Sequence, residues 1–229
     1  MPRAGPVLIF CCLVAAAQRA VSQPPADELS AAQRDVIDRG GQVFVTEKVE
    51  GSPWPRATVL QYVDATPEEA AAVFADYDRH ATYLPGVKKS RIARAIDRRT
   101  VEVDYVLRVP LVADERYTVR DRLSRYAGDG SYAVEWTLVR ASSTKATVGS
   151  ARFRPYDNRR LAKTGTLVAY VNLVSPGSRI AGVGFVKRKA LAEVRETVRA
   201  LVRRIEAERA GEPALLAAQI TALRAALGP

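Results

Sequence analysis

The feature that most constrains the fold of this chain is a long amphipathic segment near its C-terminal end, residues 185–209 (FVKRKALAEVRETVRALVRRIEAER). Its apolar residues recur every three or four positions, which is the pattern of a helix with one apolar stripe. The stripe consists of Leu191, Val194, Val198, Leu201, Val202 and Ile205. At about 1.5 Å per residue, the helix is roughly 38 Å long. A stripe of that length needs an equally long apolar partner.

Residues 88–174 supply this partner, because almost all of them follow the alternation of apolar and polar residues that is typical of β-strands. The candidate strands are residues 88–96, 100–109, 115–125, 131–140, 147–155 and 163–174, and residues 42–50 and 56–65 form an opening β-hairpin. Since the connections are short, the strands must pair antiparallel and not through βαβ crossovers. We therefore expect an α+β fold in which one curved antiparallel sheet wraps around the long helix.

A further helix is expected between the hairpin and the strands. Thr66 is a good N-cap, Pro67 suits the first helical position, and Glu69 completes a capping box. The helix is predicted to run through residues 67–84 and to end before Pro85.

The N-terminus has the layout of a secretory signal peptide. Arg3 supplies a positive start, residues 7–17 form an apolar run that is too short to span a bilayer, and Ala20 and Ser22 are small residues at the cleavage site. Cleavage is expected after Ser22, which makes the protein secreted or periplasmic. A lipoprotein acceptor cysteine and a buried N-terminal helix are the alternatives.

The chain therefore divides into a signal peptide (1–22), an N-terminal helical extension (23–41), a main domain (42–210) and a C-terminal helical tail (211–229). The Ala-rich tail helix, residues 214–227, is too short to be stable alone in water, so it must pack on the domain. Cys11 and Cys12 both lie in the signal peptide, so the mature protein is expected to have no disulfide. The sequence indicates no particular oligomeric state.

The residue types that several kinds of chemistry need are missing. With one histidine, no cysteine in the mature chain, no nucleophile elbow and no phosphate-binding glycine loop, we expect no metal and no cofactor. His80 would need an acid partner to act as a general base, and a surface or capping position is expected instead. Asp104 and Asp121 lie mid-strand and are expected to face solvent or to pair with arginines such as Arg108 and Arg120.

The formal net charge of +10 suggests an anionic partner. An exported protein rarely meets nucleic acid, so no nucleic-acid partner is expected. Lys187, Arg188 and Lys189 lie next to the apolar Val183 and Phe185, and together they fit a rim that contacts an anionic membrane surface. A solvated arginine-rich surface is the alternative.

The inward face of the predicted sheet mixes aromatic side chains with a few hydroxyl and amide groups, as ligand cavities do. Gly149 and Ala151 are small where a filled core would prefer bulky side chains. The expected lining residues are Val103, Tyr105, Leu107, Tyr117, Val119, Trp136, Ala151, Phe153, Val168, Tyr170 and Asn172 from the strands, with Leu191, Val194 and Val198 from the helix. A dry core made of the same residues is the alternative. Gly182 and Gly184 are expected to form a hinge before the helix.

Three segments carry a resemblance to a known family. Residues 77–86 (YDRHATYLPG), 109–119 (VPLVADERYTV) and 166–180 (TLVAYVNLVSPGSRI) resemble segments of the START proteins and of the wider Bet v 1-like superfamily, also called SRPBCC or polyketide cyclase-like. The resemblance covers about residues 42–209 and departs at Ser175 and Ser178, which bear on the cavity mouth. It implies the helix-grip form of the α+β fold, with a cavity between sheet and helix.

The resemblance implies a protein that binds, and transfers, a lipid or other hydrophobic small molecule without changing it. The alternative is an enzyme of the polyketide cyclase/aromatase type, which requires acid or base groups such as His80 or Asp121 to face the cavity. A third possibility is a partner-binding module that uses the C-terminal tail and has no cavity. The fold alone does not decide among these uses.

Overall fold

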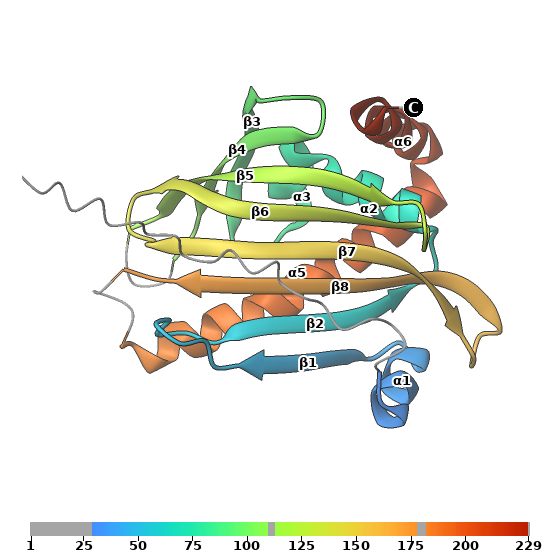
Figure 1. Ribbon diagram of the computed structural model, residues 1–229, viewed down its shortest axis with the longest axis horizontal. Helices are drawn as coiled ribbons and strands as arrows, with labels where there is room; N and C mark the ends of the chain where they lie inside the picture. The colour runs from blue at the N-terminus through green and yellow to red at the C-terminus, as the bar shows by residue number, and fades with distance from the viewer. Residues whose placement is uncertain (1–28, 110–112, 178–181, 229) are drawn as a thin grey trace, which may run out of the picture.

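The computed structural model describes residues 29–109, 113–177 and 182–228 (Figure 1). The predicted signal peptide and both cysteines lie outside these residues. The strands are β1 (Gln42–Glu47), β2 (Arg56–Val63), β3 (Val87–Ala95), β4 (Thr100–Leu107), β5 (Glu115–Tyr126), β6 (Ser131–Ala141), β7 (Ala146–Asn158) and β8 (Lys163–Ser175). The helices are α1 (Ala31–Asp38), α2 (Pro67–Ala75), the 3₁₀ turn η2 (Tyr77–Arg79), α3 (His80–Tyr83), α5 (Gly184–Gly211) and α6 (Pro213–Leu227).

The eight strands form one antiparallel sheet in the order β1-β2-β8-β7-β6-β5-β4-β3. The sheet curves, and α2, α3 and α5 lie behind it in the view of Figure 1, with α6 beyond the β5 side. This arrangement confirms the predicted α+β helix-grip fold, in which the sheet wraps around the long C-terminal helix. Among the residues that the structure describes, no helix is both long and apolar enough to span a membrane.

The apolar stripe of α5 divides along its length. Val198, Leu201 and Ile205 are completely buried against the sheet and α2, and they belong to the main hydrophobic core. Leu191 and Val194, nearer the start of α5, are only partly buried. The second half of the helix therefore closes the core, and the first half leaves space beneath it.

The predicted helix over residues 67–84 is not continuous. The Thr66–Glu69 capping box forms as expected, but Asp76 leaves the helical conformation with φ −81° and ψ 69°. The Asp76 carboxylate accepts a hydrogen bond from Gln219 of α6 at 2.9 Å. A straight helix would separate Phe74 and His80 by about 9 Å along its axis. The break instead brings the His80 ring within hydrogen-bonding distance of the Phe74 carbonyl.

The C-terminal helix α6 packs on α2 with its leucines. Leu216, Leu223 and Leu227 are buried in the main core. At the edge of this contact, the Arg224 guanidinium donates two hydrogen bonds to the Glu68 carboxylate, at 2.8 and 2.6 Å. The apolar contact accounts for the stability of a helix that would be marginal by itself.

Candidate ligand-binding cavity

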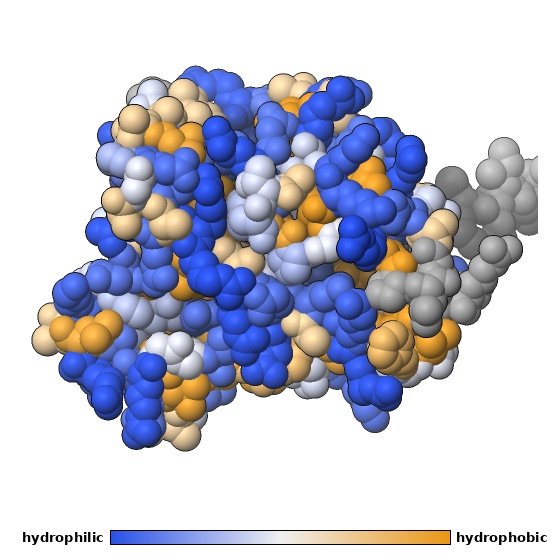
Figure 2. All heavy atoms as spheres, turned by 180° about the vertical axis from the view of Figure 1, so that it is seen from behind, coloured by the Kyte–Doolittle hydropathy of each residue, from blue (hydrophilic) through white to orange (hydrophobic). Residues whose placement is uncertain are grey.

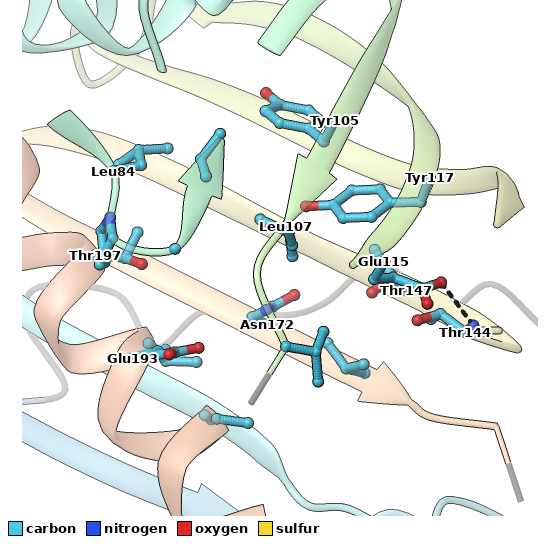
Figure 3. Close-up of a pocket in the computed structure, with 18 of the residues that line it drawn as sticks. Leu84, Tyr105, Leu107, Glu115, Tyr117, Thr144, Thr147, Asn172, Glu193 and Thr197 are labelled. Carbon is cyan, nitrogen blue, oxygen red and sulfur yellow. Dashed lines mark hydrogen bonds between the residues drawn. The ribbon is translucent and has the colours of Figure 1, made fainter. Parts of the chain in front are cut away.

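A cavity of about 260 Å³ lies between the inner face of the sheet and the first half of α5. On the face opposite to that of Figure 1, hydrophobic side chains are visible in a hollow bordered by hydrophilic ones (Figure 2). Figure 3 shows how β4, β5, β8 and α5 each contribute side chains to the wall. Four of the wall residues belong to β5 alone, namely Glu115, Tyr117, Val119 and Asp121. Because alternate residues of a strand share a face, the cavity follows β5 for roughly 20 Å.

The structure separates the predicted lining residues into two groups. Nine of them lie at the cavity wall: Tyr105, Leu107, Tyr117, Val119, Trp136, Tyr170, Asn172, Leu191 and Val194. The other five, Val103, Ala151, Phe153, Val168 and Val198, are completely buried in the core and do not line the cavity. Whether the nine contact a ligand stays a prediction.

The reason for this division is the position of Phe74 on α2. Its ring packs against Phe153 at 5.8 Å, Trp136 at 6.2 Å and Tyr170 at 6.4 Å between ring centroids. Helix α2 therefore fills one half of the concave face with packed side chains. The cavity occupies the other half, under the start of α5.

The small size of Gly149 suggested open space in the cavity, but the space beside this residue is filled. A Cβ atom placed there would lie 2.4 Å from Cζ2 of Trp136 and 2.4 Å from the carbonyl oxygen of Val171. The Trp136 indole lies directly over the glycine, so the missing side chain on β7 accommodates the ring of its cross-strand partner on β6.

His80 faces inward, which corrects its expected surface position. Its side chain is 2% exposed and lies at the cavity wall. Nε2 lies 2.8 Å from the Phe74 carbonyl oxygen, and Nδ1 lies 2.7 Å from the Tyr105 hydroxyl. A carbonyl can only accept, so Nε2 carries the proton and the Tyr105 hydroxyl donates to Nδ1. Burial lowers the pKa of His80 to about 4, so the ring is neutral at neutral pH.

Two pairs of tyrosine and tryptophan rings lie in the cavity wall. The rings of Tyr105 and Tyr117, which Figure 3 shows close together, stack with their centroids 5.3 Å apart. The ring centroids of Trp136 and Tyr170 are 5.1 Å apart. Burial raises the pKa of Tyr105, Tyr117 and Tyr170 far above the ordinary value, so all three hydroxyls stay protonated. These side chains offer apolar faces together with neutral hydroxyl groups.

Asp121 also faces the cavity, which corrects the expectation that it faces solvent or pairs with an arginine. Its side chain is 4% exposed, and Oδ2 has no hydrogen-bond partner among the described residues. Burial raises the pKa of this carboxyl to about 8. Asp104 does pair with an arginine, but with Arg140 at 3.0 Å and not with Arg108. Arg120 pairs with Glu102.

The second carboxyl group in the wall, Glu115, is held very differently. Its carboxylate accepts hydrogen bonds from the Ser143 and Thr144 backbone N–H groups at 3.0 and 2.9 Å, and from the Ser143 hydroxyl. Burial alone would raise the pKa of Glu115, but these hydrogen bonds outweigh it and lower the pKa. Glu115 is therefore an ionised group that ties β5 to the β6–β7 turn (Figure 3).

The mouth of the cavity lies at the start of α5. Lys189 lines it and pairs with Glu193 at 3.6 Å. Phe185 is 52% exposed and Val183 is 41% exposed, beside the basic residues of the predicted rim. Gly182 and Gly184 are exposed there as well, and their role as a hinge stays a prediction.

Several wall residues were not anticipated from the sequence. Trp54 and Pro55 come from the β1–β2 turn, and Thr144 and Thr147 come from the β6–β7 turn and the start of β7. Turn residues carry no periodic signal, so only the three-dimensional arrangement reveals them. Asp121 did carry a signal, because it shares the period-two face of Tyr117 and Val119. Among the described residues, no cluster of three or more metal-ligating side chains occurs.

Comparison with known proteins decides the family. A family model described as polyketide cyclase / dehydrase and lipid transport matches residues 55–206, which include nearly all of the cavity wall. The chain belongs to this family. Within it, the fold is that of the START and SRPBCC proteins, which bind hydrophobic ligands. No curated protein sequence matches the chain.

Solved structures of the superfamily share the fold. A STAR-related lipid transfer protein from Xanthomonas axonopodis is 19% identical with a TM-score of 0.62, and the alignment covers 72% of this chain and 94% of that one. A protein from Thermus thermophilus is 15% identical with a TM-score of 0.55, covering 67% and 98%. Human STARD10 is 13% identical with a TM-score of 0.50, covering 86% and 87%.

Proposed function

We propose that this protein binds a lipid or other hydrophobic small molecule in the cavity under α5 and carries it between membranes. The observation that carries the proposal is the aromatic, partly enclosed cavity itself. Its volume of about 260 Å³ lies just below the roughly 300–1,000 Å³ of typical small-molecule sites. A single chain or a small ring system fits it better than a complete two-chain lipid.

The hydrophobic contribution to binding is sufficient without a charged anchor. Each buried CH₂ group contributes about 0.8 kcal/mol, so a chain of about ten carbons gains roughly 8 kcal/mol before the cost of ordering it. The lipid transfer named for the Xanthomonas relative supports the same use of the cavity.

The start of α5 supports contact with an anionic membrane surface. Exposed Phe185 and Val183 lie beside Lys187, Arg188 and Lys189 at the cavity mouth. A Lys or Arg near an anionic surface contributes about 1 kcal/mol, and apolar side chains insert between head groups. Docking there would place the mouth against the membrane. Export through the predicted signal peptide belongs to the same proposal, and N-terminal sequencing of the protein from its own cells tests it.

A direct test uses the two tryptophans of the chain, both of which line the cavity. Native mass spectrometry of the purified protein should find a co-purifying apolar molecule, and added lipid should change the fluorescence of Trp136 in a Trp54→Phe variant. Transfer is measured between donor and acceptor vesicles. Repeated isolation of empty protein that extracts nothing from vesicles would refute the proposal.

A second candidate function, an enzyme of the polyketide cyclase/aromatase type, is favoured by one observation. Asp121 faces the cavity, and its pKa of about 8 is suited to a general acid near neutral pH. His80 does not strengthen this reading, because both of its ring nitrogens are already engaged. The two functions differ in outcome: a carrier releases its ligand unchanged, whereas a cyclase returns a molecule that has lost water. Mass spectrometry of the extracted ligand distinguishes them.

A further inference from the structure

The unpaired carboxyl of Asp121 is an unusual feature of the cavity wall. A buried polar atom without a partner costs free energy, and folded proteins keep few of them. Asp121 lies on β5 opposite Trp136 of β6, six residues along the strand from Glu115, which also lines the cavity. Its Oδ2 atom is buried and accepts from no described residue. We therefore expect a ligand to supply the missing hydrogen-bond partner of the Asp121 carboxyl.

The groups that face Asp121 are neutral. They are Tyr77 on η2, Tyr105 on β4, Tyr117 on β5 and Tyr170 on β8. The neutral His80 of α3 lies beside Tyr77 and Tyr105, and Tyr83 lies beside His80. Three carboxylates of the surrounding elements are already paired: Glu115 is bonded to the β6–β7 turn, Glu193 to Lys189, and Glu208 to Arg204. Burial alone accounts for the raised pKa of Asp121. At neutral pH the carboxyl is mostly protonated and can donate a hydrogen bond.

Tyr105 adds an acceptor of fixed orientation. Its hydroxyl proton points to Nδ1 of His80, because the other ring nitrogen donates to the Phe74 carbonyl. The oxygen lone pairs of Tyr105 are thereby left for another donor. The charge of an ionised Asp121 would raise the pKa of Tyr105, which shows that the two groups are electrostatically close. The wall thus offers one donor and one acceptor on an otherwise apolar surface.

We propose that Asp121 forms a polar subsite that binds a neutral oxygen, a hydroxyl or a carbonyl, at the inner end of a hydrophobic ligand. The inference rests on the proposed function. It names the ligand class as uncharged amphiphiles that enter with a hydroxyl or carbonyl group first. Carboxylates and phosphates are disfavoured in this orientation, because no cationic group among the described residues acts on Asp121 to neutralise a second acid. An amine would instead ionise Asp121 and pair with it.

The test compares ligands of matched chain length: decene, decanol, methyl octyl ketone, decanoate and decylamine. Binding is followed by Trp136 fluorescence in the Trp54→Phe background at about pH 6, where Asp121 is protonated. Decanol and the ketone should bind about five- to tenfold more tightly than decene, as expected for one added hydrogen bond. Asp121→Leu should abolish this preference and leave decene binding intact. Asp121→Asn, which keeps an N–H donor, should retain it.

The pH dependence of the binding preference is a second test, because a purely structural role of Asp121 would not change it. From about pH 6 to about pH 9, the preference for the ketone should disappear in the parent protein as Asp121 ionises, and it should persist in Asp121→Asn. Tyr62→Phe, which removes a buried hydroxyl that lies outside the cavity wall, should change neither result. Thermal unfolding of each variant confirms that it is folded.

The outcomes are separable. An unchanged preference in Asp121→Leu would overturn the subsite. Tightest binding of decylamine with release of a proton would also overturn it, and would assign the site to cations. If the parent protein binds no member of the series, the proposed binding function fails together with the subsite.

Discussion

His80 and Tyr105 form a buried hydrogen-bonded pair, with Nδ1 2.7 Å from the hydroxyl oxygen. Because the His80 Nε2–H donates to the Phe74 carbonyl, this pair connects the end of α2, the start of α3 and strand β4. The pair is poorly suited to proton transfer. The pKa of His80 is about 4 and that of Tyr105 lies above 10.0, so moving the proton costs more than about 8 kcal/mol. Its role is to hold the wall in place.

Replacing Tyr105 by Phe should therefore destabilise the protein. The substitution leaves Nδ1 of His80 buried without a donor, which costs about 1–3 kcal/mol. Tyr117→Phe is the matched control, because the Tyr117 hydroxyl makes no hydrogen bond with a described residue. Urea denaturation at neutral pH measures both. Equal losses for the two variants would mean that the His80 contact contributes nothing.

The pH dependence of stability follows from two buried groups with opposite signs. The pKa of His80 falls from 6.5 unfolded to about 4 folded, so its contribution is present above pH 6.5 and is lost as pH falls. The pKa of Asp121 rises from 3.8 to about 8, so its contribution is present below pH 3.8 and is lost as pH rises to about 8. Between about pH 4 and 6.5 the two slopes cancel.

Single substitutions should reveal each slope. Between pH 4 and 6.5, the free energy of unfolding of Asp121→Asn should rise by about 3 kcal/mol more than that of the parent does over the same pH range. In His80→Gln, it should fall by about 3 kcal/mol relative to the parent between pH 4 and 6.5. Comparison with the parent removes the contribution of the other titrating groups, which all three proteins share. Parallel curves for Asp121→Asn and the parent would show that Asp121 is ionised at neutral pH.

The contact between α2 and α6 offers a comparison of two kinds of interaction. Leu223→Ala removes a buried side chain from the core and should cost about 2–5 kcal/mol. Arg224→Ala removes the hydrogen-bonded ion pair with Glu68, but the Arg224 side chain is exposed to solvent, so the loss should be much smaller. Thermal or urea denaturation ranks them. A larger loss for Arg224→Ala would show that charge, and not apolar packing, holds α6 in place.

Gly149 should tolerate substitution poorly. An added Cβ would meet the Trp136 ring and the Val171 backbone at 2.4 Å, so Gly149→Ala should cost about 1–3 kcal/mol and shift the Trp136 fluorescence. Gly128→Ala is the control, because nothing lies within 4 Å of a Cβ at that position. Similar stability of the two variants would show that the β6–β7 contact adjusts freely.

The sequence predicts the fold well because periodicity is a property of each segment by itself. The apolar stripe of α5 and the alternation in the strands correctly indicated one antiparallel sheet around one helix. The extent of the cavity was not predictable in the same way, because it depends on how far α2 reaches across the sheet. Phe74 fills the half that contains Phe153 and Val168, and no local pattern encodes that distance.

The two inward-facing ionisable groups show a second limit. His80 turns inward because the chain leaves the helix at Asp76, and a single ψ angle of 69° is invisible to periodicity. Asp121 could have been placed correctly, since it shares a face with Tyr117 and Val119. The general tendency of carboxylates to be exposed or paired argued against that position. At ligand sites this tendency is often violated, so period two was the better guide there.

The proposed membrane contact is tested at the cavity mouth. Substituting Lys187, Arg188 and Lys189 by Gln removes three charges beside Phe185 and should weaken binding to anionic vesicles by about 3 kcal/mol, or more than about a hundredfold. Sedimentation with vesicles of phosphatidylserine and phosphatidylcholine measures this. The matched control removes three exposed charges from the edge strand β3, namely Lys89, Arg91 and Arg94. It should bind vesicles like the parent protein.

Phe185→Ala should weaken binding at any salt concentration, whereas the charge effect should decline as salt is added. Equal loss in the two triple variants would mean that net charge alone attracts the protein to the surface, and that the mouth has no special part in docking.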